Sequence, residues 1–117
     1  MSVEEAIQKC FDKQDETGFV YTLPDDFPAF AGHFENYPLL PAVCHVSFCA
    51  DAASRRFGKP MEIRAVKRAK FMSPVLPRTQ LVVRLTDRPD GWLAAEIVAV
   101  ESGKKLSQLT LQVTERK

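Results

Sequence analysis

Residues 30–43 read FAGHFENYPLLPAV, and this stretch decides how the rest of the chain is interpreted. A histidine, His33, stands in a segment bounded by glycine and proline, and Pro41 comes directly before a helix-like pattern. Proline is favoured at the start of a helix because its fixed φ suits helical geometry. The first backbone N–H groups of a helix have no partner within the helix, so they can bind an anion or a polarised carbonyl. The stretch therefore predicts a titratable imidazole close to a helix N-terminus.

The pattern that follows, from residue 42 to about residue 57, is helical and largely apolar. Arg55 and Arg56 suit the negative C-terminal end of a helix, and Gly58 is a typical residue for ending one. A helix that is apolar nearly all round must be buried on most of its sides. We therefore expect a curved sheet to wrap around this central helix.

Strand patterns dominate the remainder of the chain. Alternating apolar residues and flanking turn residues predict strands over residues 19–23, 61–71, 79–87, 92–101 and 106–114. In front of them, Ser2 and Glu5 form a capping box for a short amphipathic helix. The prediction is a single α+β domain over residues 1–117, in which residues 1–16 form an N-terminal helix and a polar linker.

Composition excludes several classes of function. The net charge of +1 argues against bulk nucleic-acid binding. No stretch reaches the length of a membrane span, and the acidic start lacks the features of a signal peptide, so no membrane partner is expected. Cys10, Cys44 and Cys49 form an odd set without metal-ligand spacing, which favours reduced thiols in a cytoplasmic protein.

The motif residues as a group resemble those of the hotdog-fold 3-hydroxyacyl-[acyl-carrier-protein] dehydratases. That family carries a Gly-His-Phe-Pro…Pro-x-x-Pro-Gly-Val motif that leads into a long central helix. The matching residues here are Gly32, His33, Phe34, Pro38, Pro41 and Val43. The run from Lys70 to Pro77 is similar to the family's F-x-x-P-V-x-P-G bend, and the likeness extends from about residue 19 to the C-terminus. The short N-terminal part, in which Leu23, Pro24 and Asp25 lead into Phe30, looks most like that of a small dehydratase subgroup of aryl-polyene and related polyketide-type pathways.

The resemblance implies a hotdog fold, in which a curved antiparallel sheet wraps around a long central helix. It also implies a homodimer or higher oligomer with active sites at the subunit interface. The substrate would be a 3-hydroxyacyl chain on the phosphopantetheine arm of an acyl carrier protein, in fatty-acid or polyketide-like biosynthesis. The resemblance implies neither a metal ion nor an organic cofactor.

The site residues implied by the resemblance have separate tasks in such a dehydration. His33 is the expected base, because an imidazole titrates near neutral pH. The N–H groups of Ala42 and Val43 are the expected donors to the thioester oxygen, and Gly32 and Phe34 are further substrate-binding positions. Alanine replaces the family's usual glycine at position 42 but keeps the N–H donor.

The acid is where this sequence departs from the family. The family's Glu or Asp falls on Ser47, whose hydroxyl is too weak an acid for the task. Asp51 lies one helical turn further on and is the expected replacement, whereas a structural pair between Asp51 and Arg55 is the competing interpretation. His45 is expected to pack inside the helix or to make a polar contact there.

The alternatives to dehydration are a hotdog thioester hydrolase and a non-catalytic, thioester-binding partner subunit. A basic run of Arg64, Lys67, Arg68 and Lys70 is expected either to be a solvated strand face or to dock an acidic carrier protein.

Overall fold

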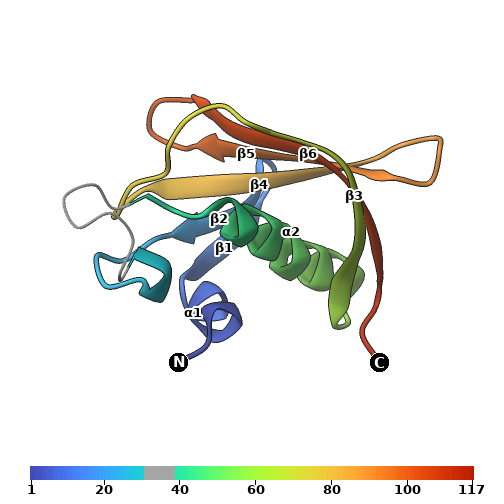
Figure 1. The fold of residues 1–117 in the computed structure, drawn as a ribbon, viewed down its shortest axis with the longest axis horizontal. Coiled ribbons are helices and arrows are strands. Elements are labelled where there is room, and N and C mark those ends of the chain that lie inside the picture. Colours follow the sequence, from blue (N-terminus) through green and yellow to red (C-terminus); the bar gives the residue numbers. More distant parts are fainter. Residues whose placement is uncertain (31–38) are drawn as a thin grey trace.

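A curved antiparallel sheet wraps around one long helix in the computed structural model, which describes residues 1–30 and 39–117 (Figure 1). This arrangement confirms the predicted α+β hotdog architecture. The helical elements are α1 (Val3–Lys9), the short 3-10 helix η1 (Pro28–Phe30) and α2 (Ala42–Phe57). The strands are β1 (Phe11–Asp15), β2 (Gly18–Thr22), β3 (Met61–Phe71), β4 (Gln80–Asp87), β5 (Leu93–Ala99) and β6 (Lys105–Glu115).

The sheet has the strand order β1-β2-β4-β5-β6-β3, and every neighbouring pair is antiparallel. The two outer strands are therefore β1 and β3. The pairing of β3 with β6 shifts register twice, between Ile63 and Ala65 and between Val66 and Arg68. Each shift is a bulge that leaves one residue of β3 without an opposite partner and bends the strand.

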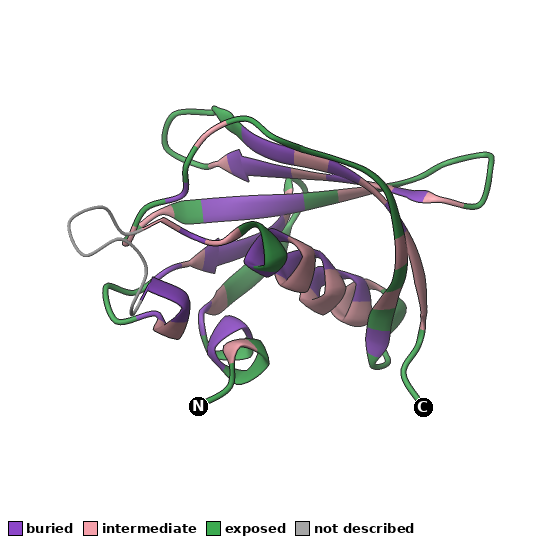
Figure 2. Cartoon of the chain, viewed as in Figure 1, coloured by how far each residue is buried: buried purple, intermediate pink, exposed green. Residues whose placement is uncertain are grey.

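The central helix α2 begins and ends where its flanking residues predict. Pro41 precedes it in an extended conformation with φ −61°, and Gly58 ends it in the left-handed region with φ +69°. Phe48 and Cys49 on this helix are completely buried, because they pack against apolar residues on the concave side of the sheet. Figure 2 shows the buried residues along the inner strands and on α2.

The N-terminal region confirms the predicted capping box but differs from the predicted polar linker. The capping box is confirmed, since the Oγ of Ser2 accepts a hydrogen bond from the N–H of Glu5 at 3.1 Å. However, residues 11–15 form the edge strand β1 and not a polar linker. These polar residues have low strand propensity, and their pairing with β2 stabilises the strand. Gly18 is required after the turn, because its φ is +137° and an added Cβ would lie 2.4 Å from the carbonyl oxygen of Val83.

Across residues 1–30 and 39–117, no helix combines the length and the apolar character that crossing a membrane requires. Cys10, Cys44 and Cys49 are all buried and unbridged.

Candidate active site at the start of the central helix

The predicted base and two of the predicted binding positions, His33, Gly32 and Phe34, lie outside the described residues. The site is therefore built from the elements on either side of them. Leu40 is fixed after that segment by a hydrogen bond of 2.9 Å from its N–H to the carbonyl of Val75. This bond ties the approach to α2 to the bend that follows β3.

A pocket of about 240 Å³ opens at the first turn of α2, and we call it the helix-start pocket. Its lining combines the entry to the helix with the end of β3: Leu39, Leu40, Ala42, His45, Phe71, Met72, Ser73 and Pro74. Ala42 and Val43 are the first two residues of α2 and both are exposed. Their N–H groups belong to the helical turn that has no intrahelical acceptors, so they are available as donors to a ligand.

His45 lies one turn into α2 and is only 3% exposed. Its Nδ1 lies 2.8 Å from the hydroxyl of Ser107 on β6, which confirms the expected polar contact. Burial lowers the pKa of His45 to about 4, so the imidazole is neutral at physiological pH. Ser107 is 62 residues away in the chain, and no sequence signal pointed to it.

Ser47 lies beside a different pocket, of about 380 Å³, which we call the helix-side pocket. It lies between α1, α2 and the start of β3. The hydroxyl of Ser47 donates a hydrogen bond of 3.2 Å to the carbonyl of Val43 in its own helix. This bond within the helix is the common use of a serine in an apolar helix, and no imidazole or carboxylate accepts from Ser47 in residues 1–30 and 39–117.

Asp51 lines the same helix-side pocket, so the structure brings it together with Ser47. Its Oδ2 accepts hydrogen bonds from the hydroxyl of Tyr21 at 2.5 Å and from the Nε of Arg55 at 2.7 Å. The guanidinium of Arg55 also stacks on Phe11, 3.7 Å from the ring centroid. These contacts support the structural interpretation of Asp51, because they tie α2 to β1 and β2.

Tyr21 was not anticipated as part of this cluster. It is completely buried, and both its burial and the Asp51 carboxylate raise the pKa of its hydroxyl. A buried phenol must donate its proton to an acceptor, and Asp51 is that acceptor. The two pockets are therefore chemically different: one offers N–H donors, and the other holds a carboxylate that is already paired.

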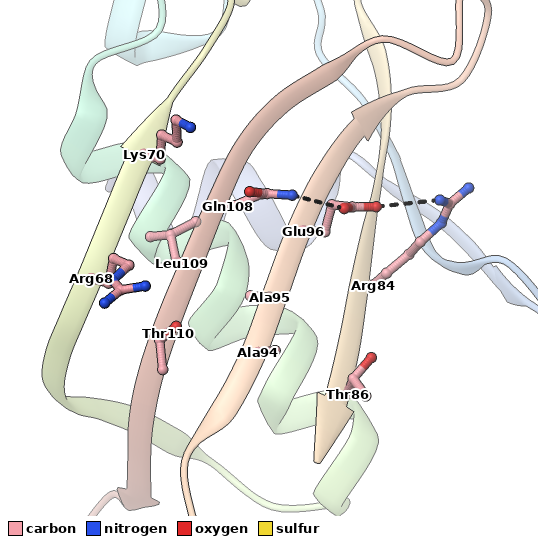
Figure 3. Close-up of a pocket in the computed structure, with 10 residues that line it drawn as sticks. All are labelled: Arg68, Lys70, Arg84, Thr86, Ala94, Ala95, Glu96, Gln108, Leu109 and Thr110. Carbon is pink, nitrogen blue, oxygen red and sulfur yellow. Dashed lines mark hydrogen bonds and ion pairs between the residues drawn. The ribbon is translucent and has the colours of Figure 1, made fainter. Parts of the chain in front are cut away.

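The four basic residues predicted to dock a carrier protein do not form one patch. Arg64 and Lys67 are the extra residues at the two bulges of β3. Arg68 and Lys70 pair with Thr110 and Gln108, on the face of the sheet that points away from α2. There they line a shallow hollow of about 470 Å³ together with Arg84 (Figure 3).

The charge of that hollow is partly neutralised. Glu96 at its centre contacts Arg84 at 3.4 Å, Gln108 at 3.3 Å and Lys105 at 3.3 Å. Arg64 and Lys67 do not line the hollow, and Lys67 lies near Asp90 and the ring of Trp92 instead. In the part of the chain that the structure describes, no three His, Cys, Asp or Glu side chains are grouped as metal ligands.

Comparisons with known proteins bear on both the fold and the site. A family model described as ApeI-like (ApeI dehydratase) matches residues 8–109. The 3-hydroxyacyl-[acyl-carrier-protein] dehydratase FabZ of Aliivibrio fischeri is 36% identical over 67 residues, which are 50% of this chain and 45% of that protein. FabZ of Vibrio atlanticus is 31% identical over 84 residues, which are 64% of this chain and 56% of that protein. The chain thus spans about half the length of the curated relatives it matches.

Solved structures support the fold. The dehydratase heterocomplex ApeI:P from Xenorhabdus doucetiae matches with a TM-score of 0.72 and 20% identity, over 88% of this chain and 93% of that chain. The E. coli PaaI protein from the phenylacetic acid degradation operon matches with a TM-score of 0.62 and 17% identity, over 97% of this chain and 89% of that chain.

Proposed function

The chain belongs to the ApeI-like dehydratase family, and from this premise we propose that it takes part in converting a 3-hydroxyacyl thioester to the 2-enoyl thioester. The observation that carries the proposal is the extent of the family match. Residues 8–109 include the helix-start pocket and the whole of α2. The proposed substrate is carried on an acyl carrier protein in fatty-acid or polyketide-type biosynthesis, and the proposed location is the cytoplasm.

The reaction divides into three tasks. His33 is the proposed base that removes the proton from C2, the carbon next to the thioester carbonyl. The N–H groups of Ala42 and Val43 are the proposed donors to the oxygen on which negative charge develops, and Gly32 and Phe34 complete the substrate contacts. An acid must then protonate the departing hydroxyl.

Two sources of that acid are open to the chain. One is Asp51, which lies on the same helix face as Ser47. The other is a carboxyl group on the central helix of a related partner subunit. The contacts of Asp51 with Tyr21 and Arg55 favour the partner, because its Oδ2 already accepts from two side chains that hold the carboxylate in a structural role.

The second candidate function follows from the same contacts. If a partner supplies the acid, this chain is a thioester-binding subunit that contributes His33 and the donors at the start of α2. The solved heterocomplex that the chain resembles is itself a dehydratase built from two kinds of subunit. A homodimer or larger homo-oligomer is the arrangement expected if Asp51 is the acid.

The test is an assay of 3-hydroxyacyl carrier protein by intact mass, with the chain alone and mixed with a dehydratase subunit that has a carboxylate at the position of Ser47. Loss of one water, abolished by His33→Ala, is the expected result. Activity of the chain alone identifies the homo-oligomer, and activity of the mixture alone identifies the binding subunit. Release of a free thiol without loss of water would instead identify a thioester hydrolase and contradict the proposal.

A further inference from the structure

Besides Tyr21, two polar side chains are buried among the described residues, and they contact each other: His45 of α2 is 3% exposed and Ser107 of β6 is completely buried. A buried polar group costs free energy unless it is hydrogen-bonded, so such a pair is retained only if it is satisfied. The 2.8 Å contact satisfies one ring nitrogen, Nδ1, and leaves the second ring nitrogen to be explained.

The contact with Ser107 fixes where the imidazole proton lies. A serine hydroxyl has one proton to donate, and the Nδ1 of His45 is the partner that the described residues offer it. If Ser107 accepted instead, its own buried proton would have no acceptor among these residues. We therefore expect Ser107 to donate to Nδ1 and the neutral imidazole to carry its proton on Nε2.

His45 itself lines the helix-start pocket, which is the space beside the ring that a ligand could enter. Side chains on a helix lean toward its N-terminus, so the ring of His45 lies over the turn that contains Ala42, and both residues line this pocket. The ring of Phe71 packs edge-on against the imidazole, with 5.0 Å between the two ring centroids, and forms an apolar wall beside it. No acceptor for Nε2 lies in residues 1–30 or 39–117.

We infer that His45 donates a hydrogen bond from Nε2 to the thioester carbonyl oxygen of the substrate, beside the backbone N–H of Ala42. This inference deepens the proposed function and rests on it. Two N–H donors aimed at one oxygen stabilise the negative charge that develops when the C2 proton leaves. Because its pKa is lowered to about 4, the ring stays neutral and does not compete with His33 for that proton.

The first test is the tautomer of His45 in the wild-type protein, read from the nitrogen chemical shifts of its ring. We expect a protonated Nε2 and an unprotonated Nδ1, and Ser107→Ala should relax this preference. A proton on Nδ1 in the wild-type protein overturns the inference, whatever reaction the protein catalyses.

The second test measures the carbonyl of a bound 3-hydroxyacyl pantetheine thioester, labelled with ¹³C, by isotope-edited infrared spectroscopy. Wild-type protein should lower the carbonyl stretching frequency, and His45→Leu should reverse part of that shift and lower kcat about 100-fold. His45→Gln, which keeps an N–H donor, should restore part of both effects. Cys44→Ala changes a neighbouring buried residue outside the pocket and is the matched control.

An unchanged carbonyl frequency in His45→Leu, with the thioester still bound, overturns the inference and leaves the proposed function standing. Failure of the wild-type protein to bind any acyl thioester contradicts the proposed function and the inference together.

Discussion

Replacing Asp51 by alanine separates a structural carboxylate from a catalytic one. The change removes the acceptor of two hydrogen bonds, one from the buried hydroxyl of Tyr21 and one from the partly exposed Arg55. A buried hydroxyl without an acceptor costs about 1–3 kcal/mol. The pair with Arg55 adds about 0.5 kcal/mol, because it is an i,i+4 pair whose arginine is 30% exposed. We expect Asp51→Ala to lower the free energy of unfolding by about 1.5–3.5 kcal/mol.

Urea unfolding followed by circular dichroism measures this loss, and a Tm lower by about 10 °C should accompany it. Tyr21→Phe removes the hydroxyl together with its need for an acceptor, so it should cost only about 1 kcal/mol. The double variant should lose less than the two single variants added together, since the two residues share one bond. The reasoning is refuted if Asp51→Ala unfolds like the wild-type protein while losing dehydration, because Asp51 would then be the acid.

Three further predictions follow from the other contacts. Because burial lowers the pKa of His45 from 6.5 to about 4, the imidazole binds a proton more readily in the unfolded chain than in the folded one. The free energy of unfolding should therefore be highest above pH 6.5 and fall by about 3 kcal/mol as the pH drops toward 4. Urea titrations at a series of pH values measure this dependence, and His45→Leu should remove it. Ser47→Glu should give the chain at least about 10-fold more dehydration on its own, and Ser47→Gln should not. Lys70→Glu should raise the KM for the carrier protein more than Arg68→Glu does, because Lys70 lies one residue from the helix-start pocket; equal effects in steady-state assays would contradict this.

The central helix was predictable because its signals are local. Pro41 and Gly58 mark its two ends, and the apolar residues between them follow a helical period. The pair of Asp51 with Arg55 was one of the two interpretations that the sequence left open for this carboxylate, since residues four apart meet on one helix face. These features depend on neighbours in the chain and needed no knowledge of the tertiary structure.

Features that depend on distant partners were not predictable. The strand β1 is made of residues with weak strand preference, and it forms because β2 offers a paired edge. Ser107 and Tyr21 look like ordinary strand residues, and only the packing of the sheet on α2 brings them to His45 and Asp51. The basic run of β3 looked continuous in sequence, whereas the two bulges divide it between different surroundings.

The most direct test is a crystal structure of the oligomer with an unreactive amide analogue of the 3-hydroxyacyl pantetheine thioester. The account predicts that the amide carbonyl oxygen lies within hydrogen-bonding distance of the backbone nitrogen of Ala42 and the Nε2 of His45, with His33 facing C2. An analogue bound in the hollow over Arg68 and Arg84, or anywhere else away from the start of α2, would contradict it.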